Sequence, residues 1–182
     1  ESNRIMFTEL GEQAYEALEA KELIDKHFWL FGSRWVDDSA DEIEDAQNMN
    51  FEEREDIICQ KRVVALKEIL QEKGLSGILE LSLKGDCAST IGFLLRRFVF
   101  SSDEESVQLI KLALESFKKD AHINYKNIIR GLLSESDDNI SLFESLSVCL
   151  DDSDKVQVYL QSPFCSKVWR LVDSLDRNYQ QA

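Results

Sequence analysis

The chain has 182 residues, 43% of them hydrophobic and 31% charged, and it contains no low-complexity stretch, so we expect a folded protein with a sizeable core. Its formal net charge is −14, and 17 acidic against 5 basic residues place −12 of that charge in residues 1–60. This excess of acids disfavours nonspecific binding to nucleic acid and to anionic membranes, because both carry negative charge. We expect neither as a partner.

The four cysteines, Cys59, Cys87, Cys149 and Cys165, form no CxxC pair. They are predicted to be small buried apolar residues in a reducing cytoplasm. No apolar run approaches the roughly 20 residues that a membrane helix needs, so we expect a cytoplasmic protein. The chain begins without Met and ends inside a helical pattern, from which we expect one domain, residues 1–182, cut from a longer protein.

One proline, seven glycines and apolar residues at every third or fourth position predict an all-α fold. The first helical stretch is expected over about residues 5–31. An acidic loop over residues 32–50 then interrupts the helical pattern for longer than any other segment. Loops of this length are often functional, so its side chains are the predicted partner surface: Trp35, Asp37, Asp38, Asp41, Glu42, Glu44 and Asp45. The neighbouring aromatic cluster over residues 28–35 fits either core or interface.

The clearest helix is predicted over residues 51–73, between an N-cap at Asn50 and a left-handed residue at Gly74. Glu53 stands where a capping box requires an acid. A short helix over residues 76–84 should follow. Asp86 is expected to cap the next helix, which runs to about Phe98 and is apolar on several sides, so deep burial is predicted for it, Phe98 included.

Four further helices are expected over residues 103–119, 122–133, 139–150 and 155–160, the first of them capped by Ser102. A last helix should open at Ser162, with Pro163 in the first helical position. Nine or ten helices joined by short links predict antiparallel helical hairpins. Helix starts about 40 residues apart favour an irregular α-solenoid, with a compact multi-helix bundle as the alternative.

Recognisable chemistry is scarce in this sequence. The acidic loop departs from a calcium-binding EF-hand because Glu42 stands where the motif requires glycine. Glu52 and Glu55 match half of a magnesium motif of helical nucleotide pyrophosphohydrolases, but acids in a first helical turn are explained by the helix dipole. Glycine-rich phosphate loops are absent from the sequence. We therefore predict no catalytic residue, no cofactor and no metal.

The segment from His27 to Trp35, followed by residues 65–81 and 91–95, resembles HEAT- and TPR-like helical-repeat regions of large bacterial multidomain proteins. Residues 162–175 are similar to a turn and helix that recur in them. Such regions commonly accompany NTPase or other effector domains. The resemblance implies a scaffold, sensor or regulatory segment and carries over no catalytic residue.

These observations predict a scaffold that acts through contact with a protein partner or with another domain of the same chain. Two alternatives stay open at this stage. One is a helical hydrolase with a carboxylate-held metal, and the other is an acidic mimic of nucleic acid.

Overall fold

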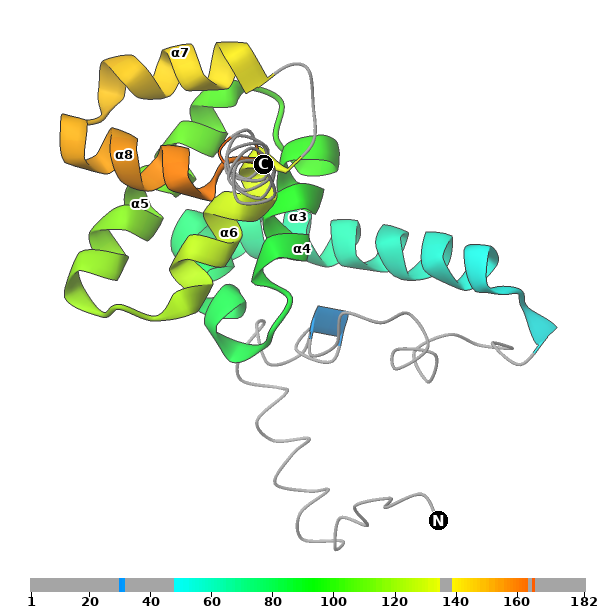
Figure 1. Cartoon of the computed structure of the whole chain (residues 1–182). Helices are drawn as coiled ribbons and strands as arrows, with labels where there is room; N and C mark the ends of the chain where they lie inside the picture. Colours follow the sequence, from blue (N-terminus) through cyan, green and yellow to red (C-terminus); the bar gives the residue numbers. More distant parts are fainter. Residues whose placement is uncertain (1–29, 32–47, 135–138, 164, 166–182) are drawn as a thin grey trace, which may run out of the picture.

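The computed structural model describes residues 30–31, 48–134, 139–163 and 165. Every regular element in these residues is helical, so the predicted all-α class is confirmed. The predicted first helix falls on described residues only at Leu30 and Phe31, which are helical. The elements are α3 (Phe51–Lys84), α4 (Ala88–Leu94), the π-helical turn η3 (Leu95–Val99), α5 (Asp103–Lys119), α6 (Ile123–Leu133), α7 (Asn139–Cys149) and α8 (Asp152–Gln161) (Figure 1).

Helix α6 lies in the middle of the described helices and contacts α3, α4, α5 and α8 (Figure 1). Its apolar side chains are buried, among them Ile128, Ile129 and Leu132. Residues of α3, α4, α5, α7 and α8 join them in one continuous core. Whether this arrangement is the predicted solenoid or the alternative bundle stays a prediction.

The closest packing in this core joins α4 to α6 through two glycines, Gly92 and Gly131. A Cβ atom added to Gly131 would lie under 3.0 Å from the carbonyl group of Ser89 and from the Cα of Gly92. A Cβ on Gly92 would in turn meet the backbone of Ile128 and Leu132. The two backbones therefore touch at a distance that only glycine permits.

Helix α3 begins as the sequence predicts. The Asn50 side chain accepts a hydrogen bond from the Glu53 N–H, and the Glu53 carboxylate accepts one from the Asn50 N–H, both at 2.9 Å. The predicted helix end at Gly74 is confirmed. Gly74 has a positive φ of 65° and a ψ of −161°, neither of them helical, so a kink divides α3 there into two helical segments.

The C-terminal end of α3 is held by a side chain of α6. The amide of the buried Asn124 donates to the carbonyl oxygens of Ser82 at 2.7 Å and Gly85 at 2.8 Å. The prediction that Asp86 caps the next helix is wrong. The N-cap residue of α4 is Cys87, and no side-chain hydrogen bond caps that helix.

Helix α8 begins three residues earlier than predicted, because Asp151 caps it by accepting a hydrogen bond from the Asp154 N–H at 2.8 Å. The predicted cap at Ser162 is confirmed, since its hydroxyl oxygen accepts from the Cys165 N–H at 3.2 Å. All four cysteines are free thiols. The predicted burial of Cys149 is wrong. Cys149 is the last residue of α7 and is exposed to solvent, as are Ser147 and Val148 before it.

Candidate functional site

The predicted partner surface lies outside the described residues, from Trp35 through Asp45. Of the predicted loop over residues 32–50, only the last three residues are described, and they lead into the N-cap of α3. Of the aromatic cluster over residues 28–35, the structure places the Phe31 side chain in the core, with 1% of its surface exposed. Any other candidate site therefore has to be sought on the described helices.

The helix that starts at α4 widens at its C-terminal end into the π-helical turn η3. There the Phe100 N–H donates to the Leu95 carbonyl oxygen at 2.7 Å, five residues back rather than the usual four. The extra residue shifts the side chains that follow by about one position. Val99 and Phe100 consequently pack against the core, while Phe98 stays 45% exposed.

The predicted deep burial of Phe98 is therefore wrong. In an uninterrupted α-helix Phe98 would share a face with the buried residues Ile91, Leu94 and Leu95. The π-helical turn rotates it off that face. Such turns are rare and occur frequently at functional sites, so the exposed Phe98 marks η3 for closer inspection.

Phe98 forms a cluster with Phe93 and Arg97, which we call the η3 surface. The two rings meet edge to face with centroids 6.4 Å apart. The Arg97 guanidinium lies 5.8 Å from the Phe93 ring and 5.6 Å from the Phe98 ring. Arg97 is exposed and Phe93 is half-buried. The two rings thus hold a cation in a defined position at the surface.

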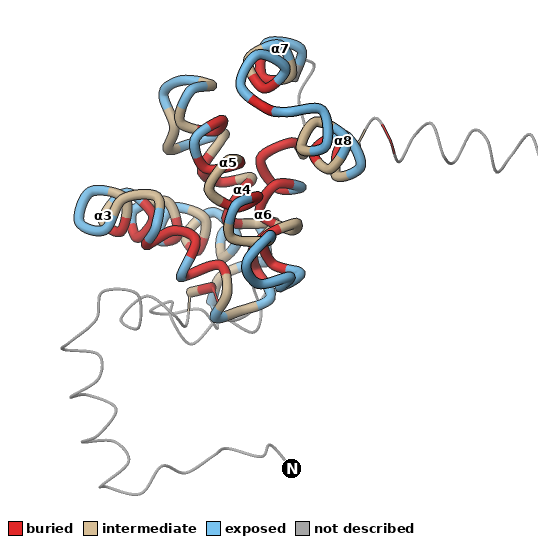
Figure 2. The backbone as a smooth tube through the Cα atoms, turned by 90° about the vertical axis from the view of Figure 1, so that its left-hand side faces the viewer, coloured by how far each residue is buried: buried red, intermediate tan, exposed pale blue. Residues whose placement is uncertain are grey.

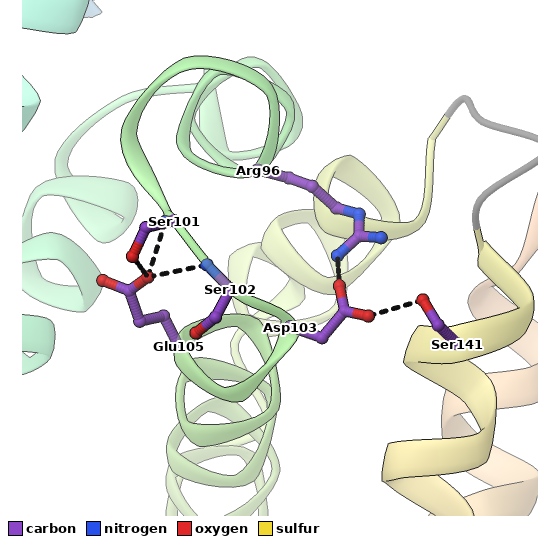
Figure 3. A network of polar contacts seen from close by, with 6 residues as sticks. All are labelled: Arg96, Ser101, Ser102, Asp103, Glu105 and Ser141. Atoms are coloured by element: carbon purple, nitrogen blue, oxygen red, sulfur yellow. Dashed lines mark hydrogen bonds and ion pairs between the residues drawn. The ribbon is translucent and has the colours of Figure 1, made fainter.

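The other arginine of η3 anchors the turn to two neighbouring helices. Arg96 donates to one carboxylate oxygen of Asp103, at the start of α5, and the Ser141 hydroxyl of α7 donates to the other, both at 2.6 Å (Figure 3). The hydrogen bond from Ser141, together with the Arg96 guanidinium, lowers the pKa of Asp103. Its carboxylate therefore stays charged at neutral pH and joins η3, α5 and α7.

The short link between η3 and α5 is fixed as well. The Glu105 carboxylate accepts hydrogen bonds from the backbone N–H groups of Ser101 and Ser102, at 2.7 and 3.1 Å, and from the Ser101 hydroxyl at 3.1 Å (Figure 3). The predicted N-cap position of Ser102 is confirmed. Hydrogen bonds therefore hold η3 through Arg96 and hold the residues that follow it through Glu105. This order lowers the entropic cost of binding a ligand at the η3 surface.

A second arginine–phenylalanine pair lies inside the protein and has a different role. Arg62 of α3 is only 5% exposed, donates from Nε to the Leu30 carbonyl oxygen at 2.6 Å and lies 6.0 Å from the Phe31 ring. Burial lowers the pKa of Arg62 and raises that of the neighbouring Cys59 thiol, which stays protonated at neutral pH. This pair attaches residues 30–31 to α3.

Parts of α7 and α8 are exposed to solvent (Figure 2), and some of their exposed residues are apolar. Val156, Tyr159 and Leu160 share one face of α8, and Ile140 and Val148 project from α7. Among the described residues, none of the four aliphatic side chains in this set has a charged group stacked on it in the way that Arg97 is stacked on its two rings. We therefore take the η3 surface as the candidate site.

Two further findings concern metal binding and membrane spanning by the residues that the structure describes. Glu52 and Glu55 are exposed on the first turns of α3. In the described part of the chain, no three His, Cys, Asp or Glu side chains come together in a way that could hold a metal ion. None of the helices described here is long and apolar enough to cross a membrane.

Comparison with known proteins gives no relative. No protein-family model, no curated protein and no solved structure matches this chain. The resemblance to helical-repeat regions of bacterial multidomain proteins therefore stays a prediction, and the candidate site has to be argued from its own geometry.

The η3 surface was not predicted from the sequence, although one signal for it was present. Phe98, Val99 and Phe100 are three consecutive apolar residues, and an α-helix cannot direct all three toward one core. One of them had to leave the core face or the helix had to change its geometry. Which of the three becomes exposed depends on packing against the other helices and does not follow from local periodicity.

Proposed function

We propose that this chain is a protein-interaction segment, a scaffold or regulatory part of a larger cytoplasmic protein, and that it docks its partner through the η3 surface. The observation that carries the proposal is the exposure of Phe98 beside the ring-held Arg97, at a turn where the helix has left regular geometry. Aromatic side chains and arginine are the residues most enriched at energetically dominant positions of protein interfaces.

Anchoring of the surface supports the same proposal. A binding residue that is already held in place loses less conformational entropy when a partner arrives. The two rings hold the guanidinium of Arg97, and the Arg96–Asp103–Ser141 network holds the backbone beneath it. The partner is either another protein or another domain of the same chain. The acidic segment with Trp35 and Asp37 is proposed as a second contact region.

Site-specific photocrosslinking tests the proposal. Phe98 is replaced by a benzoyl-phenylalanine crosslinker in the full protein, in cells that produce it. The matched control carries the crosslinker at Val148 of α7, which is 87% exposed and lies outside the η3 surface. A discrete adduct is expected from position 98, absent from position 148 and abolished by Arg97→Ala. The protein in the adduct is then purified, and Phe98→Ser should weaken its binding about tenfold or more while costing only about 0.5 kcal/mol in the free energy of unfolding.

Two results would overturn the proposal. One is the same adduct from both positions, which would show that crosslinking reports exposure alone. The other is a purified partner that binds the Phe98→Ser variant as tightly as it binds the unmodified protein.

A further inference from the structure

We infer that the helix at η3 switches between two registers, one that exposes Phe98 and one that buries it, and that Glu105 holds the exposed one. We call them the π-register, which the structure shows, and the α-register, in which the turn has regular α-helical geometry. This inference rests on the proposed function and names how its docking surface is regulated. It follows from an apolar run, from the backbone of the turn and from the contacts of the link that follows.

The apolar run Phe98-Val99-Phe100 offers the core two alternative sets of side chains. In the π-register Val99 and Phe100 are half-buried and pack against the core, and Phe98 is 45% exposed. In a regular α-helix each residue advances by about 100°, so Phe98 would stand on the face of the buried Ile91 and Leu94. The two arrangements exclude each other, because Val99 of the π-register and Phe98 of the α-register would need the same place.

The backbone of the turn finds a hydrogen bond in either register. In the π-register the Leu95 carbonyl oxygen accepts from the Phe100 N–H at 2.7 Å. In the α-register the same oxygen would accept from the Val99 N–H, four residues ahead of it. Because Leu95 keeps a donor in both cases, the choice of register depends mainly on packing and on what holds the two ends of the turn.

The two ends of the turn are held in different ways. The end that continues from α4 is fixed by packing, since the α4 backbone touches that of α6 at Gly92. A change of register therefore has to move the residues that follow the turn. There the Glu105 carboxylate accepts from the N–H groups of Ser101 and Ser102, at 2.7 and 3.1 Å, and from the Ser101 hydroxyl at 3.1 Å (Figure 3). One carboxylate thus holds this link where the π-register requires it.

The register decides whether the docking surface is available. A partner that contacts the Phe98 ring binds only the π-register, so its apparent affinity falls with the fraction of molecules in that register. Hydrogen bonds to a charged group are the stronger ones, and three of them end on Glu105. Their loss should shift the equilibrium toward the α-register about tenfold or more.

The test places 4-fluorophenylalanine at position 98 of the full chain and compares ¹⁹F NMR spectra in light and heavy water. The solvent-isotope difference in chemical shift is large for an exposed ring and small for a buried one. Glu105→Ala should reduce this difference. Through-hydrogen-bond couplings to the Leu95 carbonyl carbon identify the register directly, since the donor should change from the Phe100 N–H to the Val99 N–H.

Glu104→Ala is the matched control for the loss of the carboxylate. Glu104 lies in the same first turn of α5, and within the described part of the chain its carboxylate contacts Gln108, at 3.5 Å, and not the link. This variant should leave both the isotope difference and the donor to Leu95 unchanged.

Val99→Ser is a second variant, which leaves the start of α5 intact. It removes apolar burial from the π-register and should therefore also reduce the isotope difference at position 98. Val63→Ser, at a half-buried valine of α3 that packs against the core, is its control and should leave the ¹⁹F signal unchanged. A melting curve of each variant establishes that it is folded.

The inference and the proposed function fail separately. If Glu105→Ala and Val99→Ser both keep the isotope difference and the Phe100 donor, the register switch is overturned, while a specific crosslink from position 98 still supports docking. An equal change in Val63→Ser would also overturn the switch, because the ring would then respond to general loosening of the core. A change of register without a specific crosslink from position 98 would overturn the proposed function alone.

Discussion

Helix α4 and the turn η3 are consecutive parts of one helical rod, yet they meet the rest of the molecule in opposite ways. In α4, Gly92 brings the backbone against Gly131 of α6 with no room for a methyl group. In η3, the helix widens and turns Phe98 toward solvent. Tight packing of α4 therefore fixes the position from which η3 presents its side chains.

The contact between α4 and α6 should be the most sensitive to substitution. In Gly131→Ala the new methyl group would collide with backbone atoms of Ser89 and Gly92, which cannot move away as a flexible side chain can. We expect a loss of about 3 kcal/mol in the free energy of unfolding, measured by urea denaturation.

Gly74→Ala is the matched control for this substitution. Gly74 has nothing within 4 Å of an added Cβ, but its φ of 65° and ψ of −161° are essentially restricted to glycine, so backbone strain of about 2 kcal/mol is expected, less than the loss at Gly131. Equal losses in the two variants would mean that the α4–α6 contact is looser than the structure shows.

The next largest effect is expected at Asn124, which holds the end of α3 in front of α4. Asn124→Ala leaves the carbonyl oxygens of Ser82 and Gly85 without the donor that they share, which should cost about 2 kcal/mol. Thermal melting measures the loss. Asn127→Ala is the control, because its amide makes only a 3.5 Å contact to Asn124, and it should melt close to the unmodified protein.

The anchoring network beneath η3 gives a smaller and pH-dependent effect. At neutral pH Asp103→Asn removes the charge between Arg96 and Ser141 and should cost about 1 kcal/mol, since the site is partly exposed. The pKa of Asp103 is lowered in the folded state, so its contribution is complete above the unfolded pKa of about 3.9 and is lost as the pH falls through the folded pKa.

Urea denaturation at several pH values checks the sign. The difference between the Asp103→Asn variant and the unmodified protein should be constant from pH 7 to about pH 5 and shrink below about pH 3.9. A difference that grows on acidification would contradict the assignment of Asp103 as a charged hydrogen-bond acceptor.

The smallest effect on the free energy of unfolding is expected at the exposed Phe98 of η3. Phe98→Ser removes a half-exposed ring and should cost about 0.5 kcal/mol in unfolding measurements. Leu95→Ala, in the same turn but fully buried, should cost about 3 kcal/mol. If the two substitutions were equally costly, Phe98 would be a core residue and the contrast between α4 and η3 would disappear.

Local chemistry explains which features were predictable. The Asn50–Glu53 capping box, the positive φ of Gly74 and the caps at Ser102 and Ser162 depend on residues a few positions apart, and each is confirmed. The predicted helices over residues 103–119 and 122–133 match α5 and α6 for the same reason.

The wrong predictions concern features that depend on contacts between segments far apart in the sequence. Asp86 was a plausible cap, but Cys87 takes the N-cap position of α4, after a turn whose Gly85 carbonyl oxygen accepts a hydrogen bond from Asn124 of α6. The predicted partner surface, from Trp35 to Asp45, lies outside the described residues and stays a prediction. The η3 surface escaped prediction because the exposure of Phe98 depends on what surrounds it.

By itself the sequence determined the helices, because periodicity and capping act through neighbours along the chain. Only the tertiary structure decided which apolar residues are buried. Packing of α4 against α6 sets the rotation of the rod, and the π-helical turn lets two residues of the run Phe98-Val99-Phe100 pack against the core. Val99 and Phe100 are half-buried there, and Phe98 lies beside Arg97 at the surface, where the proposed docking site is.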